Sequence, residues 1–114
     1  PLYTVEDAES VFPLIKSYNF AEVITINNEL KIRFQRAGHI LGAAIVEVFV
    51  RGDNTSKKIV FSGDLGRYVD PIMPPPLSIK DADILLVEST YGNRDNIDTS
   101  PEKELGRIIR HTIE

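Results

Sequence analysis

The sequence predicts an α/β fold in which a mixed, mostly antiparallel sheet is flanked by helices. Two observations carry this prediction. Helical periodicity occupies both ends of the chain, and strand-like segments separated by turn residues occupy its middle. The 114 residues suit a single domain, and 42% hydrophobic with 26% charged residues is the balance of a globular protein.

The first expected element is an amphipathic helix over residues 5–17. Thr4 and Asp7 have the spacing of a capping box, in which two side chains satisfy free backbone groups at a helix start. Apolar residues then recur at helical intervals, so that the helix has one apolar face: Val5, Ala8, Val11, Phe12 and Ile15.

Two antiparallel strand pairs are expected next. Residues 22–26 and 30–35 have strand character, and the Asn27-Asn28 pair between them tolerates the left-handed backbone of a tight turn. Residues 43–51 and 57–62 form the second pair, joined by a turn at residues 52–55.

The remainder of the chain is expected to form a loop, a strand and a helix. Residues 64–80 contain prolines that cannot supply sheet donors, so this segment is predicted to be irregular. Residues 84–87 are all apolar, as in a strand buried on both faces. The last helix is predicted to begin at Pro101, with Glu102 and Glu104 near its positive end.

Composition excludes several classes of protein. Lys and Arg number 13 and Asp and Glu number 17, so the net charge of −4 argues against a strongly basic nucleic-acid binder. The chain has no cysteine, which excludes a disulfide framework, a cysteine-based zinc site and a cysteine nucleophile. We expect a cytoplasmic protein, because its lack of cysteine fits a reducing compartment and no apolar run approaches the roughly 18 residues of a membrane span.

Three predicted strand ends carry groups capable of chemistry. His39 lies between Gly38 and Gly42, which allow a sharp bend of the backbone. Asp64 follows one apolar strand and Glu88 follows another, and the three residues are spaced by 25 and 24 positions. Such strand ends can converge on one edge of a sheet, and imidazole with carboxylate suits zinc or manganese.

Each of these residues also has a structural explanation. His39 could be a loop histidine satisfied by backbone hydrogen bonds, and Asp64 could close an Asx turn after its strand. Glu88 could pair with Arg94 or another base, because a carboxylate next to an apolar strand needs a partner.

The metallo-β-lactamase superfamily has successive motifs that resemble three segments of this chain: AGHILGA at 37–43, FSGDLGR at 61–67 and VESTYGNR at 87–94. The branch that they resemble is the β-CASP branch, the RNA-processing nucleases related to the endonuclease subunit of the cleavage and polyadenylation factor. Residues 2–8 are similar to the helix that precedes the first of these motifs. The resemblance implies that the chain forms part of an αββα sandwich.

The resemblance also implies roles for individual residues. His39 matches a ligand of one zinc ion, and Asp64 matches the carboxylate that bridges two zinc ions. Glu88 matches an acid that supports a catalytic histidine, so Asp64 and Glu88 are the expected catalytic residues. Arg67 and Arg94 are candidates for binding substrate phosphate, with a structural contact as the alternative for Arg94. The implied cofactor is zinc and the implied substrate is RNA.

The chain departs from the family pattern in one important respect. The motif His-x-His-x-Asp-His is absent, and the only histidines are His39 and His111. We therefore expect a piece of a longer protein, with residues 1–88 in a partial metallo-β-lactamase domain and residues 89–114 beginning the inserted β-CASP region. Because two ligands rarely hold zinc tightly, the isolated chain is expected to be inactive and to bind metal weakly or not at all.

Two other functions are compatible with the same fold. One is a non-catalytic scaffold in an RNA-processing complex, and the other is a hydrolase of small esters or thioesters. The retained His39, Asp64 and Glu88 argue against a scaffold, and the Glu-Ser-Thr-Tyr-Gly stretch argues against a small-ester hydrolase.

Part of a sandwich would also leave apolar surface bare, so we expect the chain to self-associate.

Overall fold

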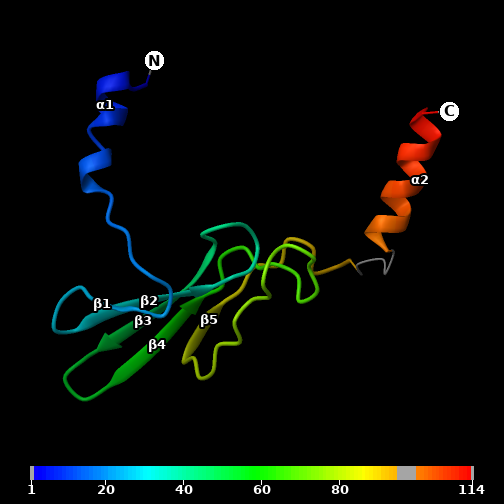
Figure 1. Cartoon of the computed structure of the whole chain (residues 1–114). Coiled ribbons are helices and arrows are strands. Elements are labelled where there is room, and N and C mark those ends of the chain that lie inside the picture. The colour runs from blue at the N-terminus through cyan, green and yellow to red at the C-terminus, as the bar shows by residue number, and fades with distance from the viewer. Residues whose placement is uncertain (1, 95–99, 114) are drawn as a thin grey trace.

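The computed structural model describes residues 2–94 and 100–113 of the chain. Two helices, a 3₁₀ turn and five strands follow one another in sequence order (Figure 1). Their bounds are α1 Val5–Glu9, the 3₁₀ turn Phe12–Leu14, β1 Val23–Thr25, β2 Leu30–Arg36, β3 Ala44–Arg51, β4 Ser56–Phe61, β5 Ile84–Leu86 and α2 Pro101–Ile113.

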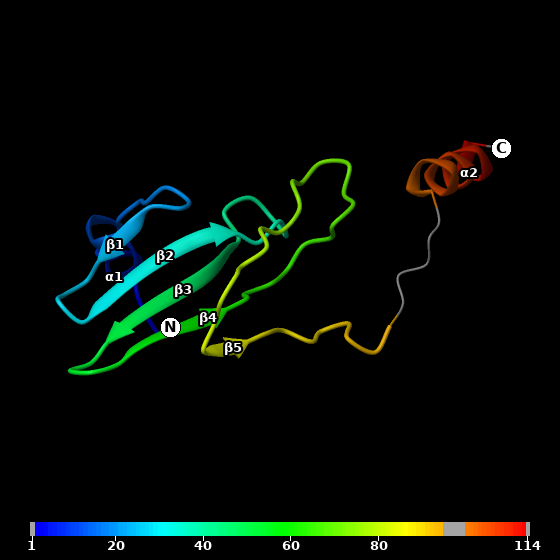
Figure 2. The same cartoon turned by 90° about the horizontal axis from the view of Figure 1, so that it is seen from below.

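The five strands form one sheet in the order β1-β2-β3-β4-β5. The first four strands pair antiparallel, and β5 pairs parallel to β4 (Figure 2). The parallel pair requires a crossover, which the proline-containing segment between β4 and β5 supplies. The predicted α/β class with a mixed, mostly antiparallel sheet is therefore confirmed.

The tight turns are those that the sequence predicted. The Asn27 side-chain oxygen accepts hydrogen bonds from the backbone N–H groups of Glu29 (2.9 Å) and Leu30 (2.8 Å), which closes the turn between β1 and β2. The Gly52 N–H donates to the Thr55 carbonyl at 2.7 Å between β3 and β4. These local bonds set the register of both hairpins.

The first helix is much shorter than predicted. The capping box between Thr4 and Asp7 is present, but α1 ends at Glu9, so the expected helix over residues 5–17 is wrong. A 3₁₀ turn containing Pro13 replaces its second half. Proline has no N–H to donate and disfavours the helical conformation of the residue before it, and apolar periodicity alone did not account for that.

The two faces of the sheet differ in chemistry. One face carries a polar cluster centred on Glu47, which is only 1% exposed and lies beside the buried Ile45 and Val60. The opposite face is apolar along the central strands, with Val46 and Val48 of β3 half-buried between their neighbours on β2 and β4. Period-2 alternation along β3 produces both faces.

Strand β5 is exposed, contrary to the prediction of a strand buried on both faces. Ile84, Leu85 and Leu86 are 50%, 60% and 47% exposed. The reason is the strand order, because β5 lies at the edge of the sheet with β4 as its one neighbour among the described strands. An all-apolar run predicts strand character but not the position of the strand in its sheet.

Helix α2 lies clear of the sheet in both views, and Figure 1 shows α1 separated from the sheet as well (Figures 1 and 2). No residue of α1 is buried, and the apolar side chains of α2 remain about half exposed or more. Within residues 2–94 and 100–113, no helix combines the length and apolar character needed to cross a membrane.

Candidate functional site

The three predicted strand ends lie at the same end of the sheet. Strands β2, β4 and β5 all run toward this end, as the antiparallel and parallel registers require. The loops that follow them carry His39, Asp64 and Glu88. The Gly66 N–H of the Asp64 loop donates to the Ala37 carbonyl, and the Leu65 N–H donates to the Glu88 carboxylate, so the Asp64 loop contacts both of the others. The three segments, which the sequence allowed to converge, therefore leave the sheet at the same end.

Glycine makes the close contact between the first two loops possible. The Gly66 N–H donates to the Ala37 carbonyl at 2.9 Å, and a Cβ atom at Gly66 would overlap the Gly38 carbonyl oxygen. The same Cβ would lie 2.7 Å from the His39 backbone nitrogen. Only a residue without a side chain lets the backbone of the Asp64 loop touch the backbone of the His39 loop.

The prolines further along the Asp64 loop also pack against Gly38. Gly38 has a φ of +70°, and a Cβ there would lie 2.6 Å from the Pro74 carbonyl oxygen and 2.8 Å from the Pro76 nitrogen. Gly38 is buried, whereas the neighbouring His39 is exposed. A buried glycine thus directly precedes a histidine that is exposed to solvent.

Glu88 is held by groups of two different loops. Its carboxylate accepts a hydrogen bond of 2.6 Å from the Leu65 N–H and one of 2.7 Å from the Thr90 hydroxyl. The Leu65 N–H and the Thr90 hydroxyl lower the pKa of Glu88, and the nearby charge of His39 makes a smaller contribution in the same direction.

Arg94 was the alternative partner expected for Glu88, and the structure places it elsewhere. Among the described residues, Glu88 forms no ion pair with Arg94, and the guanidinium of Arg94 lies over the Tyr91 ring at 5.7 Å from its centre. Arg67 and Arg94 are both exposed and lie on the loops that leave this end of the sheet. Their positive charges therefore border the loops that carry Asp64 and Glu88.

The donor set at this edge is incomplete for a metal ion. No group of three metal-ligating side chains comes together within residues 2–94 and 100–113. His39 offers an imidazole and Asp64 offers a carboxylate, both on exposed loops whose backbones touch. Imidazole and carboxylate are ligand types that zinc accepts. Two such ligands are fewer than the three or four that proteins use to bind zinc.

Two residues of structural importance were missed by the sequence analysis. Ser62 is 5% exposed and accepts a hydrogen bond of 3.0 Å from the Glu88 N–H. Glu47 is paired with Arg33 at 2.6 Å and Lys58 at 2.7 Å. A polar residue inside an apolar strand is the signal that could have identified Glu47, because such a residue needs partners on neighbouring strands.

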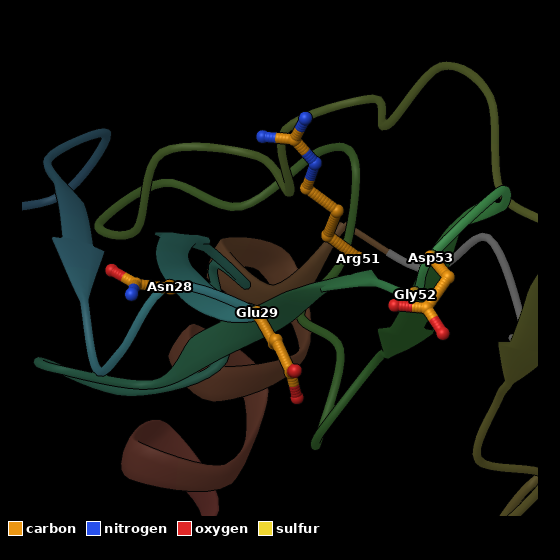
Figure 3. A pocket seen from close by; sticks show the side chains of 5 residues that line it. All are labelled: Asn28, Glu29, Arg51, Gly52 and Asp53. Atoms are coloured by element: carbon orange, nitrogen blue, oxygen red, sulfur yellow. The ribbon is translucent and has the colours of Figure 1, made fainter.

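The far end of the sheet has a shallow depression that does not form a site. It is lined by the two hairpin turns, with Asn28, Glu29, Arg51, Gly52 and Asp53 around it (Figure 3). In Figure 3 the Arg51 guanidinium points away from the carboxylates of Glu29 and Asp53. Because its polar groups diverge, this depression offers no focused contact to a ligand.

Comparison with known proteins identifies relatives along nearly the whole chain. The chain is 35% identical over 118 residues to the "RNase J-like protein" of Methanocaldococcus jannaschii, covering 98% of this chain and 27% of that protein. It is 35% identical over 114 residues to "Endoribonuclease YSH1" of Eremothecium gossypii, covering 98% and 14%. It is 32% identical over 114 residues to "Ribonuclease TTHA0252" of Thermus thermophilus, covering 100% and 24%.

The three alignments cover nearly all of this chain but only part of each relative. The chain spans between 14% and 27% of the length of these three proteins. No family model matches the sequence. The alignments to all three relatives contain the His39, Asp64 and Glu88 loops, because they cover 98% or more of the chain.

Proposed function

Since the chain is homologous to ribonucleases of the β-CASP branch of the metallo-β-lactamase superfamily, we propose that it carries part of the active site of a metal-dependent RNA hydrolase. The convergence of the His39, Asp64 and Glu88 loops at one end of the sheet is the observation that carries this proposal. The names of the relatives indicate that the substrate is RNA.

His39 and Asp64 are the residues that would hold zinc. His39 would donate a ring nitrogen, and Asp64 would donate a carboxylate oxygen. Zinc held by these residues would supply Lewis acidity, which would make water a better nucleophile near neutral pH and offset negative charge at phosphorus. The close contact between Gly66 and Gly38 keeps the two donor loops together before any ion binds.

Glu88 has acceptor capacity left for a further catalytic group. A carboxylate has about four acceptor positions, and the Leu65 N–H and the Thr90 hydroxyl use two of them. The remaining positions would accept an N–H from a histidine and so orient its ring. Arg67 and Arg94, both exposed, would bind the phosphates of the RNA on either side of the cleaved bond.

The chain would contribute to two domains of the longer protein. Residues 1–88 would belong to the metallo-β-lactamase domain and residues 89–114 to the start of the β-CASP region. Alone, the chain would bind zinc weakly or not at all and would not cleave RNA, because two donors do not complete a zinc site. It holds no cysteine, which suits a protein of the reducing cytoplasm.

A zinc titration followed by NMR tests the proposed metal ligands. We expect signals of the His39 ring and the Asp64 carboxylate to shift on addition of Zn²⁺, and we expect His39→Ala to abolish the response. His111→Ala is the matched control, because His111 lies on α2 and is the other histidine of the chain. Equal responses of His39 and His111 would show nonspecific imidazole binding and count against the site.

The coding region on both sides of the chain distinguishes an enzyme from a scaffold. A His-x-His-x-Asp-His motif upstream and further histidines downstream would complete the ligand set of a nuclease. If neither were found, His39 and Asp64 would be isolated loop residues, and the non-catalytic scaffold would be the better description.

A further inference from the structure

We propose that Ser62 and Glu88 act together as positioning residues that fix the backbone on both sides of Asp64. The inference rests on the proposed function, because it takes Asp64 to be the residue whose orientation matters. Its evidence is a set of hydrogen bonds between the end of β4 and the end of β5, independent of any bound ion.

Ser62 fixes the peptide group that precedes Asp64. Its hydroxyl donates to the Gly63 carbonyl oxygen at 2.7 Å, and that carbonyl belongs to the same peptide plane as the Asp64 N–H. Gly63 has a φ of +56°, and a Cβ there would lie 2.8 Å from the Ala44 carbonyl oxygen. The backbone therefore turns sharply between Ser62 and Asp64, and the serine hydroxyl holds the turn in one orientation.

Glu88 fixes the peptide group that follows Asp64. The Leu65 N–H lies in the peptide plane that contains the Asp64 carbonyl, and it donates to the Glu88 carboxylate at 2.6 Å. The Thr90 hydroxyl holds the second carboxylate oxygen at 2.7 Å, which limits rotation of the carboxylate. Asp64 thus lies between two peptide planes that are each held by a side chain.

Two further hydrogen bonds join Ser62 to strand β5 and to Glu88, so that Ser62 and Glu88 form a single unit, called the clamp. The Glu88 N–H donates to the Ser62 hydroxyl oxygen at 3.0 Å, while the Ser62 N–H donates to the Leu86 carbonyl at 2.9 Å. Ser62 is 5% exposed, so water does not readily compete for its hydroxyl. An exposed aspartate on a loop that is fixed at both neighbouring peptides loses little freedom when it binds a ligand.

Amide hydrogen exchange on the 114-residue chain tests the proposal. In Ser62→Ala we expect the Leu65 and Glu88 amides to exchange at least ~10-fold faster, because both are held by the clamp. The amide of Val48 in β3 reports on the rest of the sheet and is expected to keep its protection. Ser62→Thr retains the hydroxyl and is expected to restore slow exchange at both positions.

Ser10→Ala is the matched control. The Ser10 hydroxyl also donates to a backbone carbonyl, that of Asp7 at 2.7 Å, but on an exposed helix away from the sheet. We expect this variant to leave the Leu65 and Glu88 amides unchanged. Unchanged exchange in Ser62→Ala, or an equal loss of protection at Val48, would overturn the proposal, the latter because it would show a general structural role.

The zinc titration and the upstream coding region separate this proposal from the proposed function. If Asp64 responds to Zn²⁺ in the unmodified chain, Ser62→Ala is expected to weaken the response and Ser62→Thr to restore it. A zinc response that is equally strong in Ser62→Ala would overturn the positioning role. No zinc response in the unmodified chain would agree with its two-donor set, whereas the absence of a His-x-His-x-Asp-His motif upstream would count against the proposed function. In either case the exchange experiment would still decide whether Ser62 and Glu88 form the clamp.

Discussion

At the scale of single residues, Gly66 shows how one missing side chain shapes the candidate site. A Cβ at this position would overlap the Gly38 carbonyl oxygen and crowd the His39 nitrogen, and both neighbours are backbone atoms that cannot rotate away. Gly66→Ala is therefore expected to lower the free energy of unfolding by about 1–3 kcal/mol, the usual cost of overpacking. Urea unfolding followed by circular dichroism measures the change.

Gly42→Ala is the informative comparison for Gly66→Ala. Gly42 has open space around its Cβ position but a φ of +85°, so alanine there is strained without being crowded. We expect a cost of about 1 kcal/mol, with no separation of the His39 and Asp64 loops. A Gly66→Ala variant as stable as the unmodified chain would contradict the close contact between the loops.

Glu47 has a lowered pKa that links its charge to the stability of the fold. Burial by itself raises its pKa, but hydrogen bonds from Arg33, Lys58 and Gln35 outweigh burial and lower the pKa to about 2 from 4.5. A carboxyl with a lowered pKa in the folded state stabilises the fold above its unfolded pKa. That stabilisation is lost as the pH falls from about 4.5 toward 2.

Glu47→Gln tests this contribution. The variant leaves Arg33 and Lys58 without their carboxylate, so we expect a loss of about 3 kcal/mol at neutral pH and a weaker dependence of stability on pH below 4.5. Denaturant unfolding from pH 7 to pH 3 measures both effects. Glu29→Gln removes an exposed carboxylate and is expected to change stability by less than about 0.5 kcal/mol.

At the scale of elements, Pro13 sets the end of the first helix. Pro13→Ala restores an N–H donor within an apolar helical pattern, so we expect α1 and the following 3₁₀ turn to join into one longer helix. Carbon chemical shifts of residues 10–15 are expected to become helical, and helical circular dichroism is expected to increase. Pro71→Ala, in the irregular loop, is expected to change neither; a helix that still ends at Glu9 would refute this explanation.

The same elements show how far the sequence predicts the structure. Turn residues such as Asn27 and Gly52 act locally, so the strand pairs that they join were predicted to within about a residue. Strand β5 was assigned correctly in sequence, but its exposure depends on which strand lies beside it, and the apolar run carries no such information. Local signals thus predicted the strands, whereas only the folded structure shows which strands lie side by side.

The candidate site was predictable to a similar degree. The glycines on either side of His39 indicated a sharp bend of the backbone, and the structure shows Gly38 with a φ of +70° in close contact with Gly66. The role of Ser62 could not be predicted, because its hydrogen-bond partner at Glu88 lies 26 residues away and is brought near by the parallel pairing of β4 and β5. Long-range register, which no local pattern encodes, decides such contacts.

At the scale of the whole molecule, the exposed apolar surface predicts self-association. Strand β5 presents an apolar edge, with Leu85 60% exposed, and the described part of the chain places no strand beside it. An unpaired apolar edge can pair with the edge of a second molecule, and burial of apolar surface then favours the complex. We therefore expect size-exclusion chromatography with light scattering to give a mass above 12.8 kDa that rises with concentration.

A charge on the edge strand tests which surface is responsible. Leu85→Lys places a lysine where a second strand would pair, so we expect it to shift the chain toward the monomer. Leu2→Lys makes the same substitution at a residue that is fully exposed near the N-terminus, and it is expected to leave the mass unchanged. A monomeric unmodified chain at all concentrations would refute self-association, whereas an equal effect of both substitutions would show that net charge, and not the β5 edge, controls it.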